Sequence, residues 1–388
     1  MPVIEQIVAK RAELAELRRD IHAHPETAFR EERTAGIVAR ELERFGIEVH
    51  TGIAKTGVVG KLAAGSSPRA IGLRADMDAL PIQEANQFAH RSRNDGRMHA
   101  CGHDGHTTML LGAAQYLART RNFDGTVYFI FQPAEEGEGG GRAMVEEGLF
   151  ERFPMECVFG MHNWPGMPVG KFGLRAGPMM ASSDIFEIRV IGRGAHAALP
   201  QHGADPIVAA SAIVQSLQTL VSRNLDPVDS GVVSVTQFHG GDTWNVIPAE
   251  ALLRGTVRAF RPETQDLLER RIAEVASAIA RAHGATADLR YERRYPPTVN
   301  AEREAGICAT VLEDVFGAAN VQRDVAPVMG SEDFAFMLQA KPGCYIFIGN
   351  GPGEGGCMLH NPHYDFNDDI LPIGASYWSR LAEHVLAK

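Results

Sequence analysis

The sequence predicts an α/β fold with a catalytic domain, whose central sheet is flanked by helices, and a smaller inserted α+β domain. Short apolar runs alternate with helical stretches over much of the chain. Polar motifs follow several of these runs, as they do at the ligand sites of open α/β sheets. The middle of the chain instead has the element order βαββαβ. At roughly 150 residues per domain, the 388 residues predict two domains.

The catalytic domain begins with residues 4–45, which have the apolar spacing of helices. Four apolar runs follow, and each precedes a motif of side chains that bind metals or move protons. We expect each motif to lie just past the carboxyl end of a buried strand, so that residues distant in sequence share one site. The runs are residues 70–73, 126–131, 157–160 and 345–349, and their motifs are residues 76–78, 132–136, 162–164 and 359–363.

The inserted domain has a different pattern, which begins with strand-like alternation and continues with a helix. The complete order is that of a ferredoxin-like unit, whose four-stranded antiparallel sheet has two helices on one face and leaves the other face available for pairing. We place the boundaries at the breakers Gly177-Pro178 and Tyr295-Pro296-Pro297. Residues 1–179 and 295–388 then form the catalytic domain, and residues 180–294 form the inserted one. Its expected elements are residues 184–190, 206–223, 232–238, 251–260, 262–283 and 287–291.

The composition is that of an ordinary globular protein, with 45% hydrophobic and 22% charged residues. A net charge of −10 and the lack of any Lys/Arg-rich run argue against nucleic-acid binding and favour a small soluble substrate. The sequence shows no signal-like start and no stretch of about 18 uncharged apolar residues, so we expect a cytoplasmic protein without membrane contact. Five irregularly spaced cysteines fit reduced thiols, and all except Cys101 are expected to be buried apolar residues: Cys101, Cys157, Cys308, Cys344 and Cys357.

A thiol, three imidazoles and two adjacent carboxylates fall on the expected strand ends and loops. Borderline cations such as zinc take sulfur, nitrogen and oxygen ligands, and a thiolate can bridge two of them. Taken singly, each residue is more simply a surface histidine, a solvated charge pair or a core cysteine. Their recurrence at one position in the fold favours a metal centre that suits zinc, manganese, cobalt or nickel. The set is Cys101, His103, Glu135, Glu136, His162 and His360.

The carboxylates of this region divide into different roles. Glu135 and Glu136 are adjacent and point in different directions, so one can bind metal while the other serves as a general base. Asp76 and Asp78 could also be metal ligands, but aspartates at strand exits commonly bond the turn backbone, which is the simpler reading. For Asp78 we expect a further role in orienting a histidine.

Four other residues near these motifs have weaker functional readings. His106 would share a helix face with His103 and is the lesser ligand candidate. His22 and His24, in an expected loop between helices, are interpreted as structural. Trp164 is expected to shape a pocket wall or a turn.

Three polar residues of the inserted domain stand out only slightly from their surroundings. His196 lies in an expected glycine-rich turn, Asn245 in another turn, and Arg258 on a strand surface. Considered alone, these positions indicate an exposed loop, a turn residue and a surface charge.

Six motifs, in order along nearly the whole chain, resemble the dinuclear metallo-amidohydrolase family. This family contains hippurate hydrolase, the indoleacetyl-amino-acid hydrolases and N-acetyl-diaminopimelate deacetylase and, more distantly, aminoacylase and glutamate carboxypeptidases. The resemblance implies a metallo-aminopeptidase-like catalytic domain with a mixed sheet and a ferredoxin-like lid that commonly dimerises. The motifs are residues 74–81, 98–106, 132–136, 160–162, 330–334 and 359–360.

The resemblance also implies a cofactor of two divalent metal ions, manganese or zinc ahead of cobalt or nickel. Glu135 would be the general base, and Asp78 would lie beside the metals. Asp76 stands where the distant carboxypeptidases have a histidine ligand, a departure that marks the hippurate-hydrolase branch. The implied ligands are Cys101, which bridges the two metals, and His103, Glu136, His162 and His360.

In the inserted domain, the resemblance implies that His196 from a partner subunit stabilises the oxyanion, with support from Asn245. Arg258 would hold the substrate carboxylate. The implied reaction is hydrolysis of the amide bond of N-acyl-L-amino acids. A hydroxide between the metals, formed when Glu135 takes a proton from water, would attack the carbonyl; Glu135 would then protonate the amine, and lid closure would exclude water.

Other functions are compatible with the same residues. A metallo-dipeptidase or exopeptidase and a carbamoyl-amino-acid hydrolase would use the same metal pair, because pocket walls decide the substrate. A metal-free binding protein on the same fold is disfavoured by the intact Cys101, Glu135 and histidines. We expect a homodimer or higher homo-oligomer formed through the inserted domain. The acyl group, the preferred amino acid, the metal and the choice between cis and trans action of His196 stay open.

Overall fold

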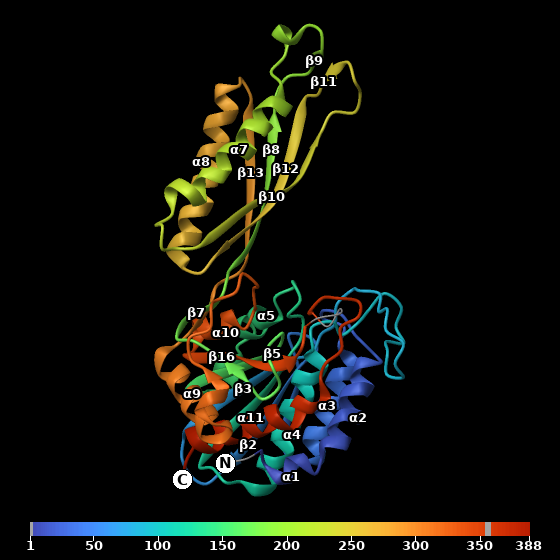
Figure 1. Cartoon of the computed structure of the whole chain (residues 1–388), viewed down its shortest axis with the longest axis vertical. Helices are drawn as coiled ribbons and strands as arrows, with labels where there is room; N and C mark the ends of the chain where they lie inside the picture. The colour runs from blue at the N-terminus through green and yellow to red at the C-terminus, as the bar shows by residue number, and fades with distance from the viewer. Residues whose placement is uncertain (1–2, 354–357) are drawn as a thin grey trace. The chain divides into compact units, whose positions relative to one another are not determined.

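A computed structural model describes residues 3–353 and 358–388, and the chain forms two compact units (Figure 1). The second unit comprises Met180–Thr298 and Pro327–Glu332, and it therefore extends past the expected inserted domain and takes in a distant segment. This segment joins the second unit because the Ala181 N–H donates to the carbonyl oxygens of Val328 (3.1 Å) and Gly330 (2.9 Å). The first unit comprises Met1–Met179, Val299–Ala326 and Asp333–Lys388.

The first unit is built on a mixed eight-stranded sheet, in the order β1-β2-β4-β3-β5-β16-β6-β15, which confirms the predicted fold class. The four apolar runs became its parallel central strands, β4-β3-β5-β16. Such strands are buried on both faces, which explains their continuous apolar sequence. The strands are β1 (Glu48–Ile53), β2 (Gly57–Ala64), β3 (Ala70–Asp76), β4 (Gly125–Gln132), β5 (Cys157–Pro165), β6 (Phe172–Gly173), β15 (Val321–Gln322) and β16 (Gly343–Gly351).

The expectation that every motif follows the end of a strand is wrong for residues 162–164. These residues lie inside β5, where His162 is paired with Phe347 and Trp164 with Gly349 of the parallel neighbour β16. The ladder with β16 continues through the motif, so β5 does not end at residue 160. The other three motifs follow or close their strands as expected.

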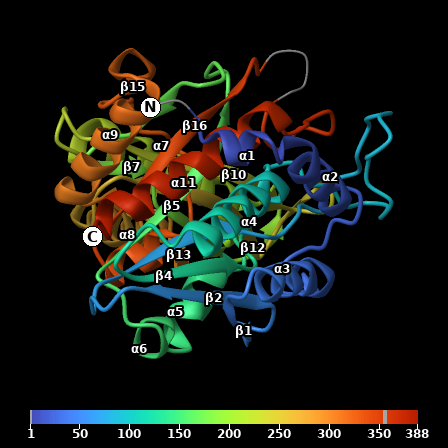
Figure 2. The same cartoon turned by 90° about the horizontal axis from the view of Figure 1, so that it is seen from below.

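Helices cover this sheet, and Figure 2 shows α4 and α11 side by side, both in contact with β3. Leu110 of α4 and Trp378 of α11 join Phe129, Phe159 and Ile346 of the sheet in one core, each at most 1% exposed. None of the helices in the described residues is long and apolar enough to cross a bilayer. The helices of the first unit are α1 (Glu5–Val8), α2 (Arg11–His22), α3 (Glu32–Arg44), α4 (His103–Thr120), α5 (Gly140–Glu146), α6 (Leu149–Arg152), α9 (Glu302–Phe316), α10 (Ala335–Ala340) and α11 (Leu371–Val385).

The second unit is a four-stranded antiparallel sheet, in the order β10-β12-β8-β13, with α7 and α8 against one face (Figure 1). Phe186, Ile188 and Val190 alternate with exposed or partly exposed residues along β8 and are buried in the core of this unit. The element order is βαββαβ, as the sequence pattern predicted. The elements are β8 (Ser183–Ile191), α7 (Pro206–Asn224), β10 (Gly231–Gly240), β12 (Glu250–Ala259), α8 (Pro262–Ala282) and β13 (Thr286–Tyr295).

Two small sheets complete the described structure. One pairs β9 (Ala195–His196) with β11 (Val246–Ile247), and the other pairs β7 (Gly177–Met180) with β14 (Thr298–Asn300). Gly177 and Pro178, expected to mark the boundary of the inserted domain, begin the short strand β7, and the second unit starts at Met180. Gly177 adopts a φ of 80°, which bends the backbone at the start of this strand.

Four of the five cysteines lie in the described residues, and all four are buried and unpaired. Burial of Cys157, Cys308 and Cys344 agrees with their reading as apolar core residues. Cys357 lies outside the described residues. Cys101 is also buried, but its surroundings are polar.

Candidate metal centre

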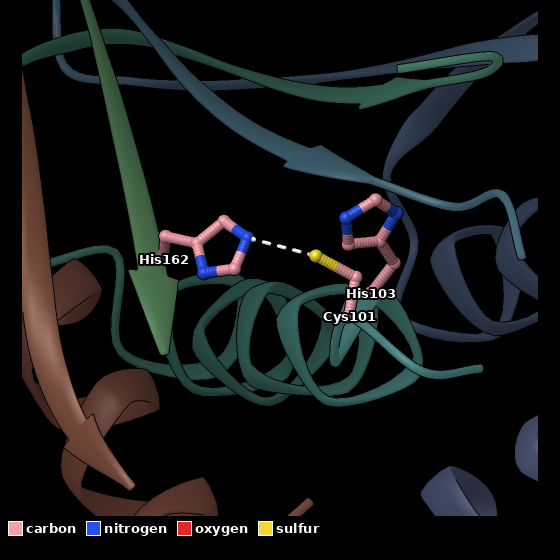
Figure 3. Close-up of side chains that lie close together, drawn as sticks. All are labelled: Cys101, His103 and His162. Carbon is pink, nitrogen blue, oxygen red and sulfur yellow. Dashed lines mark hydrogen bonds between the residues drawn. The ribbon is translucent and has the colours of Figure 1, made fainter. Parts of the chain in front are cut away.

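Cys101 and His103 flank a glycine at the first turn of α4, and both side chains rise from that turn (Figure 3). Gly102 has a φ of 95°, and a Cβ atom there would lie 2.3 Å from Asn163 Oδ1. A glycine is therefore required for both conformation and space. This turn places the thiol and the imidazole at one point of the structure.

His162 faces this pair from β5, with its Nε2 3.3 Å from Cys101 Sγ (Figure 3). The His162 Nδ1–H donates to the backbone oxygen of Asn163 at 2.7 Å, which leaves the Nε2 lone pair directed toward the sulfur. Burial and the neighbouring His106 keep the pKa of His162 well below its usual value, so the ring is neutral. A neutral imidazole with its outer nitrogen already bonded is the form that binds a metal.

His103 has a similar division between its two nitrogens. Its Nδ1 lies 2.9 Å from the backbone oxygen of Asp78 and 3.2 Å from Asp78 Oδ1. Its Nε2 is buried and has no hydrogen-bond partner in the part of the chain that the structure describes. Burial opposes a charge on this ring, but Asp76 and Asp78 outweigh it and raise the pKa of His103 to about 10. Metal binding must therefore displace a proton from His103.

Glu136 and His360 add a carboxylate and a third imidazole. Glu136 Oε1 lies 3.2 Å from His360 Nε2, and this contact raises the pKa of His360. His360 adopts a φ of 61°, and its N–H donates to the oxygen of Ala100 at 2.7 Å, which ties the C-terminal loop to the segment before Cys101. The loop thus holds a half-exposed imidazole beside the buried ligands.

Two donor groups overlap at a single sulfur atom. The ligand atoms of Cys101, His103 and His162 lie within 4.8 Å of one another, and so do those of Cys101, Glu136 and His360. The shared thiol, the bare Nε2 of His103 and the mixture of sulfur, nitrogen and oxygen donors fit two borderline divalent cations. Sequence-distant residues are therefore brought together as the motifs predicted.

Glu135 lies next to these donors and is only 7% exposed. Its ligand oxygen falls within 4.8 Å of those of His103 and Glu136, and its Oε1 accepts the Asp333 N–H at 3.4 Å. The preceding Ala134 has a φ of 53°, so the backbone turns sharply just before the two glutamates. This places a carboxylate within reach of a water molecule bound at the donor group.

Asp78 and Asp76 contact the residues that carry the possible metal donors. Asp78 Oδ1 contacts His103, while its Oδ2 accepts the Glu136 N–H at 2.9 Å, so one carboxylate holds two candidate ligand residues. Asp76 accepts a hydrogen bond from Arg74 at 2.6 Å. Burial favours the neutral acid, but the nearby His103 and Arg74 hold the pKa of Asp76 well below its usual range.

His106 also comes close to Asp76 and His103, but its nitrogens are already used. Its Nδ1 bonds Asp76 Oδ1 at 2.6 Å, and its Nε2 accepts the Asn163 N–H at 3.0 Å. A ring with both nitrogens satisfied by the protein has no lone pair for a cation. The structure therefore gives His106 a role in fixing Asp76 and β5.

His22 ends α2, whereas the sequence placed it in a loop. Its Nδ1 lies 2.8 Å from Asp104 Oδ2, and its Nε2 lies 3.3 Å from Glu84 Oε1. His24 bonds the oxygen of Asp20 at 2.8 Å. These contacts agree with the structural reading of His22 and His24.

Trp164 stacks on Phe347 with ring centroids 4.1 Å apart.

Arg74, Gln132 and Asp333 lie in three of the six motifs, but the sequence did not reveal that they form a buried polar network next to the two glutamates. Arg74 Nε donates to Gln132 Oε1 at 2.8 Å, and its Nη2 donates to Asp333 Oδ1 at 3.2 Å. Asp333 Oδ2 in turn accepts the Gly141 N–H at 2.7 Å, and the Asp333 N–H reaches Glu135. An arginine inside a wholly buried strand was the available signal, because a buried charge requires partners.

The three residues noted in the second unit lie apart in sequence and differ in exposure. His196 is exposed on β9, where it pairs with Val246 of β11. The expectation that it lies in a turn is therefore wrong, because this pairing holds the backbone in an extended strand. Asn245 is exposed, and its backbone oxygen accepts the Ala197 N–H at 3.0 Å, which fastens the two strands. The Ala198 N–H donates to the His196 Nδ1 at 3.1 Å, and both His196 and Asn245 are exposed.

Arg258 is half-buried on β12. Its Nη1 donates to Ser182 O at 3.4 Å and to Ser331 Oγ at 3.2 Å. Burial lowers its pKa from the ordinary value, although an arginine stays charged. The charge therefore has only neutral hydrogen-bond partners among the described residues.

Comparison with known proteins identifies the family. A family description, peptidase family M20/M25/M40, matches residues 72–384. The chain belongs to this family. It is 45% identical to a hippurate hydrolase of Campylobacter jejuni over 98% of this chain and 99% of that protein, and 43% identical to an IAA-amino acid hydrolase of Arabidopsis thaliana over 95% of this chain and 85% of that protein. The resemblance drawn from the motifs is thereby confirmed.

A solved structure gives the same result for the fold. The YXEP protein of Bacillus subtilis, a dinuclear metal binding peptidase from the M20 family, superposes with a TM-score of 0.86 at 35% identity and covers 98% of this chain and 99% of that one. Together with the donor groups around Cys101, this family membership supports a divalent-metal cofactor.

Proposed function

We propose that this M20-family chain hydrolyses the amide bond of N-acyl-L-amino acids and releases a carboxylic acid and a free amino acid. One observation carries the proposal: two metal-donor groups share Cys101 and have Glu135 beside them. The similarity to hippurate hydrolase and IAA-amino acid hydrolase supports the same reaction and favours benzoyl, indoleacetyl or other acyl groups on the substrate. This is the reaction that the motifs predicted.

We assign the cofactor to two cations, manganese or zinc first and cobalt or nickel as further candidates. Cys101 would serve both, and the remaining ligands would be His103, His162, Glu136 and His360. Bound cations of this kind polarise a carbonyl and lower the pKa of water. Asp78 would fix the ring of His103 through its Nδ1 and the backbone of Glu136 through its N–H.

Glu135 is proposed as the general base and acid. Its buried carboxylate takes a proton from the attacking water and later delivers it to the departing amine, so that the leaving group is neutral. Its Oε1 accepts a hydrogen bond from the Asp333 N–H at 3.4 Å, which helps to hold the carboxylate beside the donor groups. Burial strengthens this exchange because competing bulk water is excluded.

The test begins with the purified chain and a panel of N-benzoyl, N-acetyl, indoleacetyl and carbamoyl amino acids together with unacylated dipeptides. Chelation should abolish release of amino acid from an acylated substrate, and manganese, zinc, cobalt or nickel should restore it. Activity confined to dipeptides or to carbamoyl compounds would establish those alternatives. Inactivity with every metal would leave a binding protein.

Two variants test the assigned residues. Glu135→Gln should keep its metal and lose turnover by about 10²–10⁴-fold, whereas Glu138→Gln, at an exposed neighbour, should leave turnover unchanged. Cys101→Ala should lose at least one cation per chain, measured by elemental analysis, and Cys157→Ala is the control. Undiminished turnover rejects the base assignment, and an unchanged metal content rejects the bridge.

We further propose that the second unit is a lid and dimerisation domain, and that His196 acts on the active site of a second copy. In and beside the β9–β11 pair that carries His196, Leu199, Trp244 and Val246 are exposed by 47%, 101% and 50%, an apolar group that a partner chain would cover. Asn245 directly precedes β11 and would support His196 at the oxyanion. Closure of the lid would exclude water.

Mixing two inactive variants tests action in trans. A dimer of one Glu135→Gln chain and one His196→Ala chain holds one complete site, so random mixing should restore about a quarter of wild-type activity. No restoration in a proven heterodimer assigns His196 to its own chain. A monomer by light scattering rejects dimerisation.

Arg258 is proposed to bind the substrate carboxylate, because its charge has only the neutral hydrogen-bond partners Ser182 and Ser331.

The location of the protein in the cytoplasm stays a prediction, which cell fractionation would test.

A further inference from the structure

Glu31 is a completely buried carboxylate outside every motif noted in the sequence. It stands at the N-terminus of α3, and both of its oxygens accept hydrogen bonds. Oε1 accepts the N–H of Ala134 at 3.0 Å and that of Phe29 at 3.0 Å, and Oε2 accepts the Thr56 hydroxyl at 2.5 Å. A buried carboxylate costs stability unless it is bonded in this way, so its contacts need an explanation.

The contact with Ala134 concerns the backbone that carries the two glutamates of the site. Ala134 has a φ of 53°, a left-handed conformation that alanine adopts only where its surroundings enforce it. Its N–H is held by Glu31, and its oxygen accepts the Gly140 N–H at 2.9 Å. The peptide groups on both sides of this strained residue are therefore fixed immediately before Glu135.

The same N-terminal segment also supports the backbone beside Asp78. The oxygen of Glu26 accepts the Ala79 N–H at 2.8 Å, and Thr27 forms a β-bridge with Ala79. One segment thus contacts the residue after Asp78 and the residue before Glu135. It holds the two polypeptide segments that deliver the proposed ligands and base.

We infer that Glu31 is a positioning residue that sets the direction of Glu135 and Glu136 through the Ala134 amide. This inference rests on the proposed function. Glu31 accepts the hydrogen bond of the Ala134 N–H and so fixes the orientation of that peptide group. An error of about 1 Å in a catalytic group can lower turnover by about 100-fold.

Geometry and charge can be separated at this position. Glu31→Gln keeps an oxygen for the Ala134 N–H and offers an amide N–H to Thr56, without the charge. Glu31→Asp keeps the charge but is one methylene too short to reach all partners. Burial raises the pKa of Glu31 to about 7, hydrogen bonds from Thr56 oppose this, and the nearby Asp78 adds to it, so the neutral form is readily tolerated.

The experiment compares these variants with Glu31→Leu and with the matched control Asp124→Leu. Asp124 precedes β4 and accepts the N–H groups of Ser66 (2.6 Å) and Ser67 (2.7 Å), so its loss removes carboxylate–backbone hydrogen bonds without touching the segments that carry the proposed ligands and base. We expect kcat to fall by about 100-fold in Glu31→Leu and about 10-fold or more in Glu31→Asp, with KM within about twofold and metal content retained. Glu31→Gln and Asp124→Leu should keep wild-type kcat.

Full kcat in Glu31→Asp, or loss of kcat in Glu31→Gln equal to that in Glu31→Asp, overturns the inference. If Glu31→Leu does not fold, the kcat values of Glu31→Gln and Glu31→Asp still test the inference. If the wild-type chain hydrolyses no member of the substrate panel, the proposed function fails, and hydrogen exchange at the Ala134 amide then tests Glu31. Faster exchange in Glu31→Asp than in Glu31→Gln supports the inference, and equal protection rejects it.

Discussion

Asp78 gives the sharpest test of the metal centre, because one carboxylate holds two proposed ligands. Oδ1 faces the Nδ1 of His103 at 3.2 Å, and Oδ2 accepts the Glu136 N–H at 2.9 Å. Asp78→Asn conserves the shape of the side chain, but it replaces one acceptor oxygen by an NH₂ group. One of the two donors then meets another donor, and the remaining hydrogen bond loses the assistance of the negative charge.

A hydrogen bond to a charged group contributes about 1.5–3 kcal/mol. Loss of one such bond predicts a metal affinity that is about 10- to 100-fold weaker, the range found for residues that orient metal-bound histidines. Competition with a chelator measures the Kd, and kcat is measured with the metal in excess. Asp95→Asn is the control, because Asp95 is exposed. A folded Asp78→Asn chain with wild-type metal affinity and kcat would falsify the positioning role of this carboxylate.

Three further predictions follow from single contacts. Gly102→Ala should lower the free energy of unfolding by about 1–3 kcal/mol in denaturant titrations, because a Cβ would lie 2.3 Å from Asn163 Oδ1 at a φ of 95°; an unchanged midpoint contradicts this. Arg258→Gln should raise KM for acyl amino acids by about 10- to 100-fold with little change in kcat, since it removes the proposed partner of the substrate carboxylate; an unchanged KM excludes that role. Burial opposes a charge on His22, but Asp104 and Glu84 raise its pKa from 6.5 to about 9, so its charged form stabilises the folded state. This stabilisation, about 3 kcal/mol, is complete below pH 6.5 and is lost as the pH rises through 9. Urea titrations between pH 6 and 9.5 should show the decline in the wild type and a smaller one in His22→Gln, and equal slopes would count against it.

The sequence predicted much of the fold because burial controls the apolar pattern. β3 is buried along its whole length, and β8 alternates between buried and exposed positions, so each has a local signature. The proposed ligands could be found for a related reason. Thiols, imidazoles and carboxylates are uncommon beside buried strands, and their recurrence there is informative without any knowledge of distances.

Other features depend on contacts that no local pattern records. His162 lies within β5 because a neighbouring strand continues the ladder, and His196 lies in a strand because Val246, fifty residues later, pairs with it. The contact of Glu31 with Ala134 joins segments 103 residues apart. Such roles become visible only when the partners are placed in space.

The single sulfur shared by both donor groups has a consequence for how metal is taken up. Burial and the carboxylates of Glu136 and Glu135 raise the pKa of the Cys101 thiol, so removal of its proton is unfavourable. If two cations share this sulfur as proposed, the first to bind would bear the cost of removing the proton, and the second would meet a thiolate that is already formed. Loading would then be cooperative, and a sample supplied with half the metal it can bind would divide into filled and empty molecules. A cell that limits the metal would then hold fewer active enzymes and few half-loaded ones.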